Sequence, residues 1–81
     1  MKSIMTVEQL KMARAALNWS VTRLASESGV GARTIHRVET EGGLAKATSA
    51  NLKLIRETLE AAGVEFIGSP EDGPGVRLWR K

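Results

Sequence analysis

The sequence predicts a mainly α-helical domain of four helices that ends in a β-hairpin. Up to residue 62, apolar residues recur at intervals of three or four, which is typical of helices with one buried face. From Val64 onwards, apolar and polar residues alternate, as they do in a strand. A chain of 81 residues has the size of one small domain. We therefore expect a helical unit over residues 1–63 and a hairpin extension over residues 64–81.

Start and stop signals divide the first part into four helices, expected over residues 6–18, 20–28, 31–40 and 49–62. Thr6 and Gln9 have the spacing of a capping box, in which each side chain bonds the backbone amide of the other residue. Ser20 is a favourable N-cap for the second helix. Residues 42–43 are both glycine and predict a loop, and Gly63 ends the fourth helix.

Two short strands are expected after the fourth helix, over residues 64–67 and 76–79. The segment between them is rich in Gly and Pro, which predicts a long and flexible connection. An isolated two-stranded hairpin is marginally stable in water, so this hairpin should lie on the fourth helix, pair with a second subunit, or both. Trp79 belongs either to that dimer interface or to the exposed chain end. The apolar face of the hairpin would consist of Val64, Phe66, Val76 and Leu78.

The segment from residue 20 to residue 40 has the spacing of a helix-turn-helix. Ala25 is small enough for two helices to cross closely, and Gly29 provides the positive φ of a tight turn. Trp19, just before this segment, is expected to cover the core. The residues that anchor the second helix in the core would be Val30, Ile35 and Val38. The outward face of that helix, the face that enters the major groove of DNA in such motifs, would carry Ala32, Arg33, His36 and Arg37.

The charges are unevenly distributed along the chain. Residues 1–38 carry six Lys or Arg against two Asp or Glu, whereas residues 39–72 carry three against seven. The last residues add Arg77, Arg80 and Lys81. A basic face is what phosphate binding requires, so the charge pattern favours a nucleic-acid partner for the first half. A solvated surface that is basic by chance is the alternative.

Several classes of function lack the residues they need. The chain has no cysteine, which excludes disulfides, thiolate zinc sites and cysteine nucleophiles and fits a reducing cytosol. His36 is the single histidine and has no partner for metal binding or catalysis. No apolar run approaches the roughly 20 residues that cross a bilayer, and no signal peptide is recognisable. We expect a cytoplasmic protein that is not an enzyme and uses no metal or cofactor.

With these residues aligned, the chain resembles the Cro/lambda-repressor-like family of helix-turn-helix transcriptional regulators, of the xenobiotic-response-element type. The resemblance extends over residues 6–62 and rests on Leu24, Ala25, Gly29, Val30, Ile35, Val38 and Glu39. It implies a four-helix lambda-repressor-like DNA-binding domain, as in a small bacterial or phage repressor. Because one such motif reads only a few base pairs, we expect a homodimer on a palindromic operator of double-stranded DNA.

The resemblance also implies roles for individual residues. Arginine is suited to base edges because its fork reaches guanine O6 and N7 together, so Arg33 and Arg37 would read bases. His36 either contacts a phosphate or is a surface residue without a role. Arg14 and Glu39 match a family pair that ties the first helix to the end of the third. The DNA-contacting positions would be Ser20, Gly31, Ala32, Arg33, Thr34, His36 and Arg37.

Two positions depart from the family pattern. Residue 21 is often a glutamine that contacts phosphate and here is Val21, and residue 31 is often a capping Ser or Thr and here is Gly31. Together with Ala32, these residues make the expected DNA face more apolar than is usual. The alternative function is therefore a protein-binding module of the same fold, an antiactivator or antitoxin, that captures another protein. The acidic fourth helix would suit a basic partner.

Overall fold

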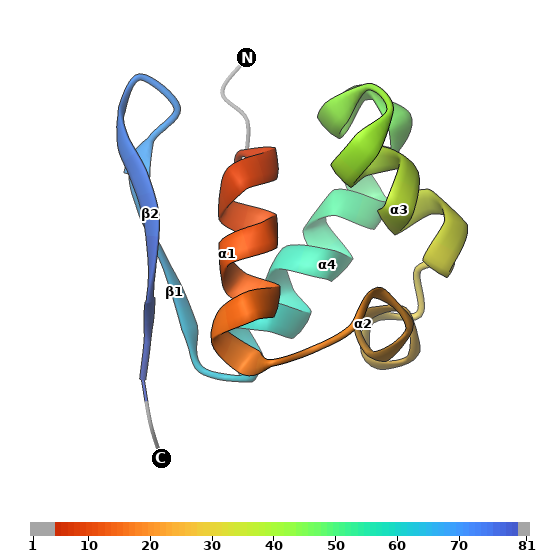
Figure 1. The fold of residues 1–81 in the computed structure, drawn as a ribbon, viewed down its shortest axis with the longest axis horizontal. Coiled ribbons are helices and arrows are strands. Elements are labelled where there is room, and N and C mark those ends of the chain that lie inside the picture. Colours follow the sequence, from red (N-terminus) through yellow and green to blue (C-terminus); the bar gives the residue numbers. More distant parts are fainter. Residues whose placement is uncertain (1–4, 80–81) are drawn as a thin grey trace.

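The computed structural model describes residues 5–79, so Lys2, Arg80 and Lys81 of the charge pattern lie outside the described residues. The elements are α1 (Val7–Leu17), α2 (Val21–Ser28), α3 (Ala32–Thr40), a 3-10 turn η1 (Gly43–Lys46), α4 (Ser49–Ala61), β1 (Val64–Ser69) and β2 (Asp72–Leu78). The predicted mainly helical fold with a C-terminal antiparallel hairpin is confirmed. In Figure 1 the hairpin forms one layer beside α1, and α2 and α3 lie on the opposite side of the molecule.

The hairpin differs from the expectation in its connection. The two strands continue into the segment rich in Gly and Pro, so that β1 ends at Ser69 and β2 begins at Asp72. Gly68 and Gly73 both have positive φ, at 76° and 62°. A Cβ atom on Gly68 would collide with the carbonyl oxygen of Gly73. The prediction of a long, flexible connection was therefore wrong, because these glycines allow a tight reversal with a close backbone approach.

The buried core draws on every helix and on the first residue of β1. Its apolar members are Met5, Leu10, Ala13, Leu24, Val30, Ile35, Val38, Ile55, Leu59 and Val64. Trp19 packs against this core, as expected, and so do Phe66, Val76 and Leu78 of the hairpin. The apolar face of the hairpin thus packs on its own chain, with β2 mainly on α1 and β1 mainly on α4. Val64 is buried there, and Phe66, Val76 and Leu78 are partly buried, so most of this face is already occupied by the chain's own helices.

Gln9 connects the start of α1 to the hairpin. The predicted capping box is present: the Gln9 amide donates to Thr6 Oγ1 at 3.0 Å, and the Thr6 amide donates to Gln9 Oε1 at 2.8 Å. The side chain of Gln9 is buried, and its Nε2 donates to the carbonyl oxygens of Ile67 and Gly75, each at 2.9 Å. One amide group therefore caps a helix and bonds both strands of the hairpin.

Candidate nucleic-acid interface

Three residues join α2 to α3, and the two helices pack against each other. The Ser20 hydroxyl accepts a hydrogen bond from the amide of Arg23 at 2.9 Å and so caps α2 as predicted. Gly29 ends α2 with a φ of 79°, a conformation that favours glycine. Ala25 is half-buried and packs on the core. These local features give the tight α2–α3 corner that is visible in Figure 1.

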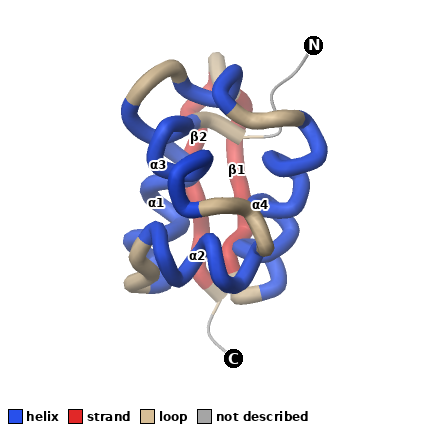
Figure 2. The backbone as a smooth tube through the Cα atoms, turned by 90° about the vertical axis from the view of Figure 1, so that its right-hand side faces the viewer, coloured by secondary structure: helices blue, strands red, loops and turns tan. Residues whose placement is uncertain are grey.

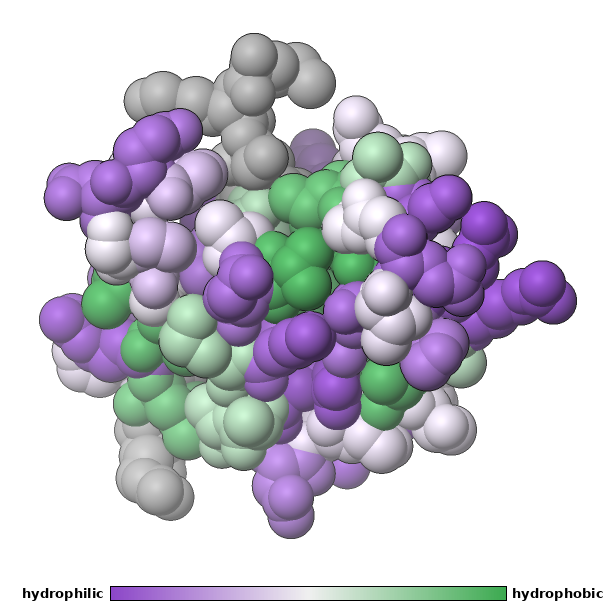
Figure 3. Space-filling model, turned by 45° about the horizontal axis from the view of Figure 1, so that its top comes forward, coloured by the Kyte–Doolittle hydropathy of each residue, from purple (hydrophilic) through white to green (hydrophobic). Residues whose placement is uncertain are grey.

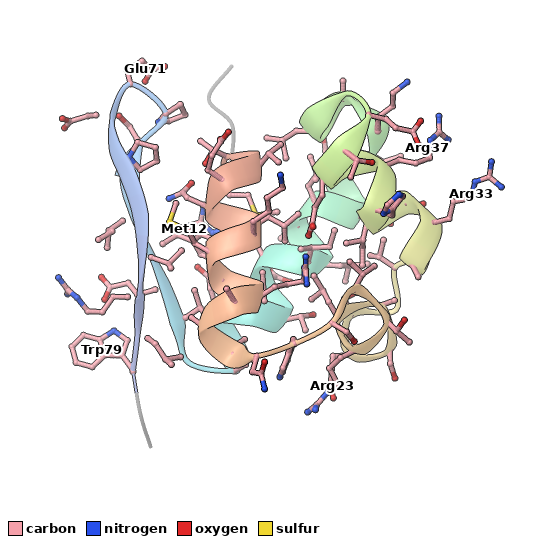
Figure 4. All side chains as sticks on the ribbon, viewed as in Figure 1. Met12, Arg23, Arg33, Arg37, Glu71 and Trp79 are labelled. Atoms are coloured by element: carbon pink, nitrogen blue, oxygen red, sulfur yellow. The ribbon has the colours of Figure 1, made fainter. Side chains whose placement is uncertain are left out.

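The helix α3 has one buried face and one exposed face. Ile35 and Val38 are fully buried and anchor α3 in the core. Arg33 and Arg37 point away from the molecule on the side opposite the hairpin, as Figure 4 shows. Most of this side is hydrophilic in Figure 3, with small apolar patches between the polar side chains. The exposed face of α3 consists of Ala32, Arg33, His36 and the partly exposed Arg37, while Thr34 is half-buried.

The arginines near this face differ in whether an intramolecular ion pair already engages them. Arg33 forms no ion pair with any residue in the range 5–79. Arg37 Nε lies 3.6 Å from Glu41 Oε1, but the two side chains are 41% and 52% exposed, so water screens this pair. Arg23, on α2, is held by Glu27 at 2.8 Å. Arg33 is therefore the arginine of this surface that a ligand can engage without breaking an internal contact.

The predicted contact between Arg14 and Glu39 is confirmed. Arg14 Nε donates to Glu39 Oε2 at 2.8 Å, and Nη2 donates to Oε1 at 2.7 Å, which makes the pair bidentate. Arg14 Nη1 also donates to the carbonyl oxygen of Trp19 at 2.9 Å. The hydrogen bond with Glu39 raises the pKa of Arg14 above its ordinary value. Arg14 therefore joins α1 to the end of α3 and to the residue before the α2 cap.

The N-terminus of α3 carries no side-chain cap, because its N-cap residue is Gly31. We expect Gly31→Ser to raise the free energy of unfolding by about 0.5 kcal/mol, since serine can accept from a free amide of the first turn. The backbone at Gly31 has a φ of −59°, and an added Cβ would meet nothing within 4 Å. Urea denaturation measures the change. Gly29→Ser is the contrasting variant: because Gly29 has a positive φ, serine there should lower the free energy of unfolding by about 1 kcal/mol. A loss of stability in Gly31→Ser would contradict the prediction.

Within residues 5–79, no group of three His, Cys, Asp or Glu residues could hold a metal ion. None of the described helices has the length and apolar character required to span a bilayer.

No protein-family model, curated protein or solved structure matches this chain. The resemblance to Cro/lambda-repressor-like regulators and the DNA-contacting roles of the site residues therefore stay predictions. The structure places Gly31, Ala32, Arg33 and His36 together on an exposed surface. Ser20 belongs to a different element, since it is the N-cap of α2.

Proposed function

We propose that the chain is a sequence-specific DNA-binding transcriptional regulator that inserts α3 into the major groove of double-stranded DNA. One observation carries the proposal: α3 exposes Arg33, His36 and Arg37 along one side while its other side is locked into the core. A rigid helix that presents basic side chains next to a second helix, across a tight turn, is the geometry of a helix-turn-helix reader.

The chemistry of the proposed interface follows from the charges. Arg33 has no ion-pair partner among residues 5–79 and can donate two hydrogen bonds to guanine O6 and N7. Arg37 lies one turn further along α3 and is held only by an exposed contact with Glu41, which a phosphate can replace. His36 and the uncapped amides at Gly31 can donate to phosphate oxygens. Val21 supplies no polar group at the start of α2.

A homodimer on a palindromic operator is part of the proposal, and the fold limits how it can form. In Figure 2 the hairpin lies behind the helices, and α2 and α3 are nearest the viewer. If two hairpins pair edge to edge, both α3 helices lie on the same side of the dimer, and one DNA duplex can contact both. Stacking the outer faces would point the α3 helices in opposite directions. Trp79, which is 57% exposed and donates to Glu65 at 2.7 Å, lies on that outer face.

The first test removes the free arginine of the interface. We expect Arg33→Ala to weaken specific binding by about 1–3 kcal/mol and to relax the preference at one base pair. An operator is first selected from a random duplex library with the parent chain, and binding is then measured by fluorescence anisotropy at several salt concentrations. The matched control is Arg77→Ala, which removes an exposed arginine from the hairpin. Equal affinity and selectivity of Arg33→Ala and the parent would exclude base reading by Arg33.

Capture of another protein is a second candidate function, and one specific observation favours it. A groove between α2 and α4 is lined by apolar side chains together with the carboxylates of Glu27 and Glu57. Carboxylates repel phosphate, so this groove does not suit DNA. None of its lining residues belongs to α3. The chain could therefore hold DNA and a protein at the same time.

A further inference from the structure

The groove between α2 and α4 has a volume of about 410 Å³. We name it the α2–α4 groove, and it is lined by Trp19, Glu27, Leu54, Glu57, Thr58, Ala61 and Ala62. Leu54 is 45% exposed. Side chains with apolar surface thus form most of the groove, and two carboxylates accompany them.

The chain itself shows what such an arrangement binds. The guanidinium of Arg23 lies 4.9 Å from the centroid of the Trp19 ring, and its Nε donates to Glu27 Oε2 at 2.8 Å. An arginine is thereby held between an aromatic ring and a carboxylate at the edge of the groove. Such cation–π contacts add to an ion pair because the ring face carries negative electrostatic potential.

The same combination occurs twice more, at sites outside the groove. The guanidinium of Arg56 lies 4.7 Å from the Phe66 ring centroid and 3.1 Å from Glu60. That of Arg77 lies 5.6 Å from the Trp79 ring centroid and 3.4 Å from Glu65. In each case an internal arginine satisfies the carboxylate beside it.

Glu57 differs from the carboxylates in these three arrangements. It forms no ion pair with any residue between positions 5 and 79, although it lines the groove beside Leu54. Glu27 Oε2 is used by Arg23, which leaves Oε1 for a second donor. The α2–α4 groove therefore offers an apolar surface, the Glu57 carboxylate, which has no ion-pair partner among the described residues, and the partly used carboxylate of Glu27. Its lining residues include no Lys or Arg, and the nearby Arg23 is already bonded to Glu27 at the edge of the groove.

We propose that the α2–α4 groove binds a segment of a partner protein that presents an arginine or lysine next to an apolar residue. The cationic group of the partner would lie between Glu57 and Glu27. The aliphatic part of that arginine or lysine and the neighbouring apolar residue would cover Leu54 and the other apolar residues that line the groove. A second copy is a poor occupant, because a two-fold axis through the groove would bring like carboxylates together. This proposal rests on the second candidate function and is independent of DNA binding.

The test adds a peptide stepwise to the full chain and monitors binding through the amide chemical shifts of the protein in NMR spectra. The probe is a six-residue capped peptide of alternating leucine and arginine, and its counterpart has glutamate in place of arginine. We expect the basic peptide to shift amides around the α2–α4 groove and the acidic peptide to leave them unchanged. Glu57→Gln should raise the dissociation constant at least threefold, and so should Leu54→Ala. Shifts spread evenly over all acidic positions would overturn the proposal.

The matched control is Glu71→Gln, which removes the same charge from the tip of the hairpin, on the side of the molecule away from α2 and Arg23 in Figure 4. The control should bind the basic peptide like the parent, and equal weakening in both glutamine variants would also overturn the proposal. A self-association that Leu54→Ala abolishes in sedimentation would assign the groove to a second copy and overturn it as well. Arg33→Ala should leave peptide binding unchanged, so failure of this proposal and failure of DNA binding are distinguishable.

Discussion

Replacing Glu39 with alanine is expected to lower the free energy of unfolding by about 2–3 kcal/mol. The Glu39 side chain is only 6% exposed, and it accepts two hydrogen bonds from Arg14, which is 21% exposed. Removing the carboxylate leaves a mostly buried guanidinium without its counter-charge, which costs far more than the loss of an exposed pair. Chemical denaturation of the parent and the variant measures the difference.

An exposed ion pair on α4 provides the control for that measurement. Arg56 and Glu60 are 3.1 Å apart, and both side chains are substantially exposed. Glu60→Ala should therefore cost only about 0–1 kcal/mol. A double-mutant cycle between Arg14 and Glu39 should show a coupling well above that value. A cycle without coupling would mean that the bidentate contact contributes nothing to stability.

Gln9→Leu is expected to lower the free energy of unfolding by about 2–3 kcal/mol, even though leucine matches glutamine in size. The substitution removes the acceptor of the Thr6 amide and the donor to two hairpin carbonyls, those of Ile67 and Gly75. Polar groups that lose their partners in a part-buried place cost about 1–3 kcal/mol each, and water relieves some of that cost here. Amide hydrogen exchange should accelerate most in β1 and β2.

Thr6→Ala separates the two roles of Gln9. It removes the hydroxyl of the capping box and leaves the bonds from Gln9 Nε2 to the hairpin in place. Thr6→Ala should lower the free energy of unfolding by about 1 kcal/mol, the usual effect of a lost N-cap. Amide hydrogen exchange in the hairpin should stay close to that of the parent. Hairpin amides that exchange equally in Gln9→Leu and in the parent would show that Gln9 does not hold the hairpin.

The helices were predictable because their caps and turns depend on contacts between residues only three or four positions apart in the sequence. Thr6 and Gln9 meet across one helical turn, Ser20 caps α2 from three residues away, and Gly29 ends it through its own φ angle. Such interactions need no partner from elsewhere in the chain, so a pattern of residue types is enough to reveal them. The contact between Arg14 and Glu39, which are 25 positions apart, was predictable only through a family resemblance.

Periodicity and local bonding were enough to predict the helices, their caps and the division of α3 into a buried and an exposed face. The bonds from Gln9 to Ile67 and Gly75, 58 and 66 residues away, could be seen only in the packed fold. The same holds for the packing of the hairpin's apolar face on its own chain and for the groove between α2 and α4. Residues far apart in the sequence meet only once the core has packed, and alternation in a strand shows which side is apolar but not what covers it.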